Sequence, residues 1–109
     1  MALRATSGPS LVTRSAKVGE TVRATAKIEN TAAGDATVTL VAEGAPVPIV
    51  FEPAAQAVRG KARATLAFEW RASLPDGVDA KTLRGKLVLR ATDTGALVGE
   101  APLDVYVTR

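Results

Sequence analysis

Few residues of this 109-residue chain could do covalent chemistry, because it contains neither cysteine nor histidine. Their absence removes disulfides, cysteine–histidine zinc sites, thiol nucleophiles and imidazole bases together. Four serines remain as candidate nucleophiles, and no histidine is present to activate them: Ser7, Ser10, Ser15 and Ser73. Ser15 and Lys17 could form a serine–lysine pair, but both would lie on one strand with no further catalytic group beside them. We therefore expect that the protein is not an enzyme.

Carboxylates between the predicted strands are the remaining candidates for a metal site. Asp76, Asp79 and Asp93 lie in such segments, and oxygen ligands of this kind suit Ca²⁺. The Asp76-Gly-Val-Asp79 segment lacks the dense alternating carboxylates of a calcium loop, and Asp-Gly is a common turn sequence. We expect no metal ion and no other cofactor.

Aromatic side chains could form a carbohydrate platform only where they are exposed. Trp70 and Phe68 fall on the side of their predicted strand that faces the core. Tyr106 falls on the outward side of the last predicted strand, where it could pack against a partner. Scattered aromatic residues make a poor sugar-binding surface, so a protein partner is the better expectation.

Positive charge is concentrated near the amino terminus of a chain whose net charge is +3. Residues 1–28 carry five cations against the single carboxylate of Glu20, which gives that segment +4: Arg4, Arg14, Lys17, Arg23 and Lys27. Such a segment favours an acidic partner surface. A nucleic-acid site would be expected to add denser Lys/Arg clusters or stacking aromatics, so we expect no nucleic-acid partner. No run of apolar residues is long enough to span a bilayer, so we expect no membrane partner.

Strict alternation of apolar and polar residues is the main secondary-structure signal. It covers residues 21–29 and, with larger side chains, residues 61–71. A period of two places one set of side chains in the core and the other in water, so both segments are predicted to be strands. Weaker strand patterns occupy residues 11–17, 36–43, 47–52, 86–92 and 96–107.

The spacing of these segments predicts the architecture. About seven strands separated by turn sequences indicate an all-β, immunoglobulin-like sandwich of antiparallel strands. The proline-flanked run 47–52 suits an edge strand, and residues 52–59 could form one helical turn. Because Gly8-Pro9 looks like a structure breaker, we expect residues 1–10 to be an N-terminal arm and residues 11–109 to be the single domain.

Several motifs resemble a known family. The run from Val18 to Thr31, VGETVRATAKIENT, is similar to the Gly-Glu-Thr/Ser-Val strand and Asn-Thr turn of bacterial immunoglobulin-like modules of the CARDB and NPCBM-associated type. The run Gly60–Trp70, the Pro75-Asp-Gly77 turn and the terminal Val-Tyr-Val extend the resemblance over most of the chain. The resemblance implies an immunoglobulin-like sandwich with a non-enzymatic adhesive or spacer role.

These observations leave three functional hypotheses. We expect first a virion accessory protein, a capsid decoration (cementing) protein that docks on the repeated shell of a bacteriophage head. The first residues lack the pattern of a secretory signal, which suits synthesis in the host cytoplasm and a final place on the virion surface. The alternatives are an adhesion or spacer module of a surface or secreted bacterial protein, and an intracellular adaptor domain.

Four residues are the expected contacts with a capsid or other assembly subunit: Leu3, Arg4, Arg14 and Tyr106. Leu3 would act as a small apolar anchor, and the two arginines would pair with carboxylates of the partner. Tyr106 would add contact area from the outward side of its strand. Copies bound at equivalent positions could also contact one another, as a homo-oligomer on the assembly.

Overall fold

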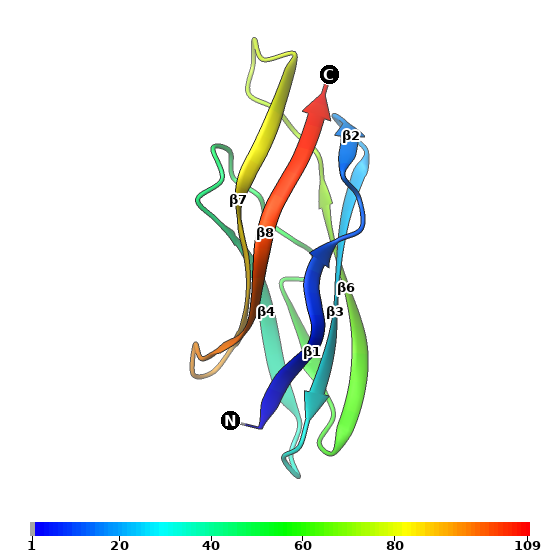
Figure 1. The fold of residues 1–109 in the computed structure, drawn as a ribbon, viewed down its shortest axis with the longest axis vertical. Coiled ribbons are helices and arrows are strands. Elements are labelled where there is room, and N and C mark those ends of the chain that lie inside the picture. Colours follow the sequence, from blue (N-terminus) through cyan, green and yellow to red (C-terminus); the bar gives the residue numbers. More distant parts are fainter. Residues whose placement is uncertain (1) are drawn as a thin grey trace.

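Two β-sheets packed face to face make up the protein (Figure 1), as described for residues 2–109 by a computed structural model. Its strands are β1 (Leu3–Leu11), β2 (Ser15–Lys17), β3 (Thr21–Asn30), β4 (Ala36–Glu43), β5 (Ala55–Val58), β6 (Ala62–Arg71), β7 (Ala80–Ala91) and β8 (Leu97–Thr108). One sheet has the order β1-β3-β6 and the other β2-β8-β7-β4-β5. Separation of β3 and β6 from β4, β7 and β8 is the immunoglobulin-like division of strands. The predicted sandwich is confirmed, with eight strands instead of about seven.

One strand pair in the sandwich is parallel, although only antiparallel pairing was expected. The chain leaves β1 in the three-stranded sheet and joins the other sheet as β2 without reversing its direction (Figure 1). β2 therefore runs parallel to β8, with Ser15 opposite Tyr106 and Lys17 opposite Thr108. This crossing ties the two sheets together along one side of the sandwich.

Residues 3–11 form strand β1 of the sandwich rather than a separate N-terminal arm. The strand pairs with β3 from Leu3 to Leu11, and these two leucines are 7% and 8% exposed. Gly8-Pro9 lies within β1, where the pairing shifts register. Proline is tolerated here because an edge strand has one side on which no ladder donor is needed. The dipeptide therefore distorts the strand without ending it.

The segment 47–52 also differs from its expectation, since it is not an edge strand. Only Glu52 pairs, through an isolated bridge to Glu69 of β6. The strand starts later, at Ala55, within the segment where a helical turn was considered. Prolines lack the N–H that a ladder needs: Pro48 lies within the segment, and Pro46 and Pro53 flank it. Regular pairing with β4 becomes possible only after the last proline.

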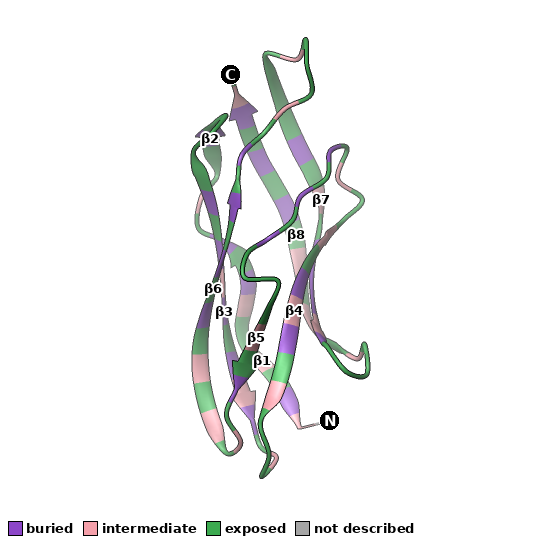
Figure 2. Ribbon diagram, turned by 180° about the vertical axis from the view of Figure 1, so that it is seen from behind, coloured by how far each residue is buried: buried purple, intermediate pink, exposed green. Residues whose placement is uncertain are grey.

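The core lies between the sheets and contains the side chains that the alternation predicted. Buried and exposed residues alternate along β3 and β6 in Figure 2. Trp70 and Phe68 are 6% and 0% exposed, and they lie opposite Val22 and Ala24 of β3. Phe51, from the irregular segment before β5, is also buried.

Asn30, at the end of β3, is the one buried polar residue of the described chain. Its Nδ2 donates hydrogen bonds to the carbonyl oxygens of Gly34 (3.0 Å) and Val58 (3.1 Å). Its Oδ1 accepts a hydrogen bond from the Ala32 N–H at 3.0 Å. One amide group thus holds the β3–β4 loop in shape and fastens it to β5 of the opposite sheet.

Replacing Asn30 with Ala should lower the free energy of unfolding by about 2–3 kcal/mol, because it leaves buried backbone groups without partners. Urea denaturation followed by the emission of Trp70 measures this loss. The matched control is Thr31→Ala in the same loop, which removes one exposed hydrogen bond and should change stability by less than about 0.5 kcal/mol. Equal effects of the two substitutions would contradict the structural role of the Asn30 amide.

Replacing Leu3 with Ala should destabilise the sandwich by about 2–3 kcal/mol, because a buried leucine is truncated inside the core. Val12→Ala is the control, since Val12 follows β1 and is 60% exposed. A Leu3→Ala protein with an unchanged urea midpoint would show that β1 does not pack as described.

Candidate binding surface

The four expected contact residues do not come together in one site. Leu3 lies in the core rather than on the surface, so it is not accessible as an anchor. Arg14 and Tyr106 are neighbours, because the Tyr106 N–H donates to the Arg14 carbonyl oxygen at 3.0 Å, and Tyr106 is 46% exposed. Arg4 lies in β1, toward the opposite end of a molecule 50 Å long (Figure 1).

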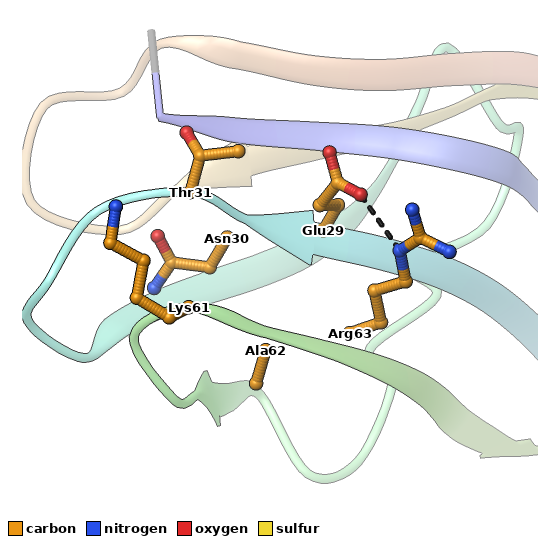
Figure 3. A pocket seen from close by; sticks show the side chains of 6 residues that line it. All are labelled: Glu29, Asn30, Thr31, Lys61, Ala62 and Arg63. Carbon is orange, nitrogen blue, oxygen red and sulfur yellow. Dashed lines mark hydrogen bonds and ion pairs between the residues drawn. The ribbon is translucent and has the colours of Figure 1, made fainter.

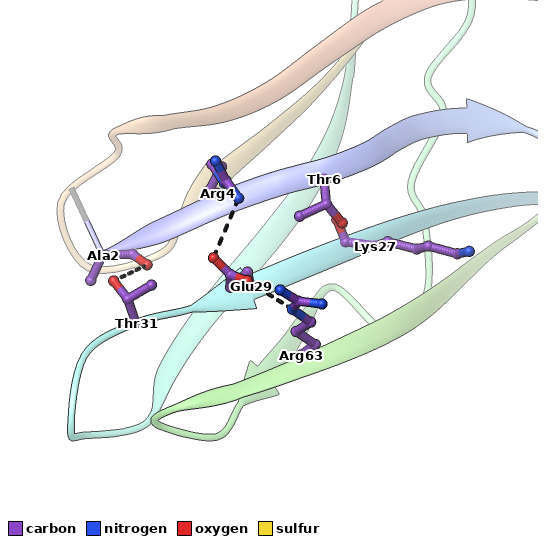
Figure 4. Close-up of polar contacts among 7 residues, drawn as sticks. All are labelled: Ala2, Arg4, Thr6, Lys27, Glu29, Thr31 and Arg63. Carbon is purple, nitrogen blue, oxygen red and sulfur yellow. Dashed lines mark hydrogen bonds and ion pairs between the residues drawn. The ribbon is translucent and has the colours of Figure 1, made fainter.

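Arg4 belongs to a row of charged residues that crosses the outer face of the three-stranded sheet (Figure 4). Its guanidinium donates to Oε1 of Glu29 at 3.4 Å, and Arg63 Nε donates to Oε2 of the same carboxylate at 2.7 Å. Cross-strand register places Glu29 opposite both arginines. Two guanidinium groups therefore share one carboxylate, which leaves the row with a charge of +1.

The other rows of this face are also basic. Arg23 Nη2 pairs with Glu69 Oε1 at 2.9 Å across β3 and β6. Three further cations have no ion pair within residues 2–109: Lys27, Lys61 and Arg71. Glu52, bridged to Glu69 at the edge of β6, adds an exposed carboxylate to the same face. Six cations less three carboxylates give this face a net charge of +3. We call it the basic face, consisting of Arg4, Arg23, Lys27, Glu29, Glu52, Lys61, Arg63, Glu69 and Arg71.

The outer face of the five-stranded sheet is electrically balanced. Its charged residues form cross-strand pairs with N···O distances of 3.3–3.9 Å: Arg84–Asp104, Lys86–Glu100 and Arg90–Glu43. Lys17 of β2 lies at its margin without an ion pair among the described residues. The positive charge of the protein is therefore displayed mainly by one of its two sheets.

The distribution of charge along the sequence indicated only half of the basic face. The charge of residues 1–28 pointed to Arg4, Arg23 and Lys27, but the contributions of β6 come from a segment more than thirty residues later. The signal was present in the outward positions of the alternating segment 61–71, which include Lys61, Arg63 and Arg71. Recognising it required the antiparallel pairing of β3 with β6, which the sequence pattern did not provide.

The hollows on this face are open and shallow. One of about 290 Å³ lies where β3 and β6 meet the loops, lined by Glu29, Asn30, Thr31, Lys61, Ala62 and Arg63 (Figure 3). In the described part of the chain, no buried side-chain N or O atom lacks a hydrogen-bond partner. Residues 2–109 also contain no group of three His, Cys, Asp or Glu side chains able to bind a metal ion. The arrangement offers cations and hydroxyl groups on a broad surface, which suits contact with an acidic macromolecule.

No helix within residues 2–109 is long and apolar enough to cross a membrane.

Comparison with known proteins adds likeness in fold only. No protein-family model matches the chain, and no curated protein matches it. Among solved structures, the alkylpurine DNA glycosylase AlkC of Pseudomonas fluorescens, bound to DNA containing an abasic site analogue, matches 95% of this chain and 30% of its own, at 12% identity and a TM-score of 0.56.

Two further solved structures are more distant. The CupB2 chaperone of Pseudomonas aeruginosa matches 88% of this chain and 52% of its own, at 11% identity and a TM-score of 0.43. SSP-19, an MSP-domain protein like family member of Caenorhabditis elegans, matches 88% of this chain and 94% of its own, at 11% identity and a TM-score of 0.41. This chain thus spans about a third of the glycosylase and half of the chaperone, and its resemblance to the glycosylase is one of fold.

Proposed function

We propose that this protein is a non-enzymatic docking module that binds an acidic surface of a protein assembly through its basic face. The observation that carries the proposal is the charge asymmetry of the two sheets, +3 on one face and near balance on the other. Complementary charge speeds encounter and fixes orientation more than it adds affinity. A face of this kind therefore determines which side of the module meets its partner.

A protein partner fits this face better than nucleic acid. Three carboxylates, Glu29, Glu52 and Glu69, lie among the cations, where they would repel a closely approaching phosphate backbone. Stacking on bases would need aromatic side chains, and Trp70, Phe68 and Phe51 are all buried. The DNA in the glycosylase structure belongs to that protein, and the likeness to it concerns the fold.

The specific form of the proposal is a decoration protein on a viral shell. The sandwich needs no disulfide, since the chain has no cysteine, so it can fold in a reducing cytoplasm. A repeated shell presents many equivalent acidic patches, and each bound copy stabilises the assembled state by mass action. An adhesion or spacer module and an intracellular adaptor domain would use the same face on a different acidic partner.

Reversing two unpaired charges of the basic face tests the proposal. The double variant Lys27→Glu/Arg71→Glu should bind purified particles from the source of this chain at least about tenfold more weakly, because repulsion replaces attraction. Co-sedimentation at increasing salt measures the affinity, and wild-type binding should weaken as screening shortens the range of the charges.

The matched control reverses two cations of the opposite face, Lys17→Glu/Arg84→Glu, and so makes the same change in net charge. This control should bind particles like the wild type. Equal losses in both double variants would refute docking through the basic face. Absence of any co-sedimentation would refute the viral form of the proposal, and tighter binding to duplex DNA than to particles would refute a protein partner.

A further inference from the structure

The four edge strands of the two sheets differ in how well they are protected against pairing with another chain. β2 and β5 have three and four residues, and β1 contains two register shifts and a proline. Short, bulged or proline-containing edges resist the addition of a further strand. β6 is the exception, with ten residues and no register shift along its pairing with β3.

The free edge of β6 can be assigned residue by residue. Glu69 exchanges both of its backbone hydrogen bonds with Glu52, at 2.7 and 2.9 Å, so its backbone polar groups point away from β3. Alternation along a strand then directs the N–H and C=O groups of Ala67, Thr65 and Arg63 the same way. The Ala67 carbonyl oxygen is occupied by Gln56 Nε2 at 2.7 Å.

Beyond these two contacts, the described residues make no hydrogen bond to this edge of β6. Glu52 and Gln56 cover the end of β6 that carries Trp70, and Figure 2 shows β5 beside the strand. β3 is the only ladder partner of β6 within residues 2–109. Arg63 and Thr65 therefore present two N–H and two C=O groups without a backbone partner, and Ala67 presents one N–H.

The side chains at this edge indicate the chemistry of an added strand. Arg63 and Thr65 stand outward from the sheet and are exposed, and Lys61 is exposed in the turn just before β6. Glutamate or aspartate on a strand beside them would form cross-strand pairs. On the inner side Ala62 and Ala64 are only half-buried and leave room for apolar side chains of a neighbouring strand. The complementary segment therefore alternates acidic and apolar residues.

A second copy of β6 is a poor occupant of the same edge. Antiparallel pairing of two such edges around Ala64 would place Arg63 opposite the other copy's Thr65, which sets the Arg63 cations of the two copies on a diagonal across the pair. Like charges on paired strands are destabilising. The same charges therefore oppose self-association and favour a partner of opposite sign.

We propose that an extended, acidic segment of the partner protein adds as an antiparallel strand to the free edge of β6, pairing with the backbone of Arg63 and Thr65. This inference rests on the proposed docking function and specifies how the partner is held. Strand addition of this kind takes affinity from main-chain hydrogen bonds and specificity from alternate side chains.

A synthetic peptide of about eight residues, alternating glutamate and valine with capped ends, is the probe. It should bind the protein, as measured by fluorescence anisotropy, and should slow hydrogen exchange at the Arg63 and Thr65 amides. A peptide with lysine in place of each glutamate should bind at least about tenfold more weakly. No slowing of exchange at these two amides would overturn the proposal.

N-methylation of the probe separates backbone pairing from charge attraction without altering the protein. In antiparallel pairing the glutamates lie directly opposite Arg63 and Thr65, so their N–H groups point toward β6. Methylating the glutamate amides should abolish binding, whereas methylating the valine amides, which point away, should leave it intact. Equal binding of the two methylated peptides would show that the contact is electrostatic only.

Thr65→Pro removes an outward N–H that β3 does not use and places a ring where the new strand would lie. This variant should lose peptide binding, whereas Thr65→Val, which keeps the N–H, should bind like the wild type. Far-UV circular dichroism checks that each variant is folded, and the methylated peptides provide the same test if Thr65→Pro is not.

Two outcomes distinguish this inference from the proposed function. If particle binding depends on Lys27 and Arg71 but the Arg63 and Thr65 amides are not protected from hydrogen exchange, docking through the basic face is supported and strand addition is refuted. Sedimentation as a dimer in which the Arg63 and Thr65 amides are protected would identify a second copy as the occupant and refute an acidic partner segment.

Discussion

The hydrogen bonds of the buried Asn30 amide fix the end of the sandwich on which the basic face depends. A buried amide without partners is costly, so the loops around Asn30 must supply two acceptors and one donor. The β5–β6 turn packs tightly against the β3–β4 loop at Gly60. Only glycine fits there, because a Cβ on residue 60 would lie 2.2 Å from the carbonyl oxygen of Ala33. The next residues enter β6 with Ala62 opposite Asn30. The amide and the glycine thus hold the place where β6 begins.

The residue at which β6 begins determines which of its side chains face the core, which face solvent, and which backbone groups point away from β3. Side chains of a strand alternate between its two faces, so a slip of one residue would move Phe68 and Trp70 to the surface and Arg63 into the core. The observed register keeps both aromatic residues below 7% exposure and places Arg63 against Glu29. The same register directs the backbone groups of Arg63 and Thr65 away from β3. Core, charged face and free edge are three results of one register.

Local patterns in the sequence predicted the parts of this arrangement that depend on local geometry. Residues 21–29 and 61–71 were recognisable as strands because alternation reports burial directly. Strand β1 was not recognisable, since Gly8-Pro9 reads as a chain break when the pairing with β3 is unknown. The basic face was only half visible for the same reason: its two contributing segments become neighbours through long-range pairing.

In the proposed strand addition, the side chains that protect the edge of β6 would also recognise the partner segment. β1, β2 and β5 are protected by shape, through irregularity or shortness, and such protection excludes any added strand. β6 is regular, and its open stretch is protected by the charges of Lys61 and Arg63. Protection by charge depends on the sign of the approaching strand, since it repels a basic segment and attracts an acidic one. The proposed strand addition would use this difference, because the charges at the edge disfavour a basic strand and favour an acidic one.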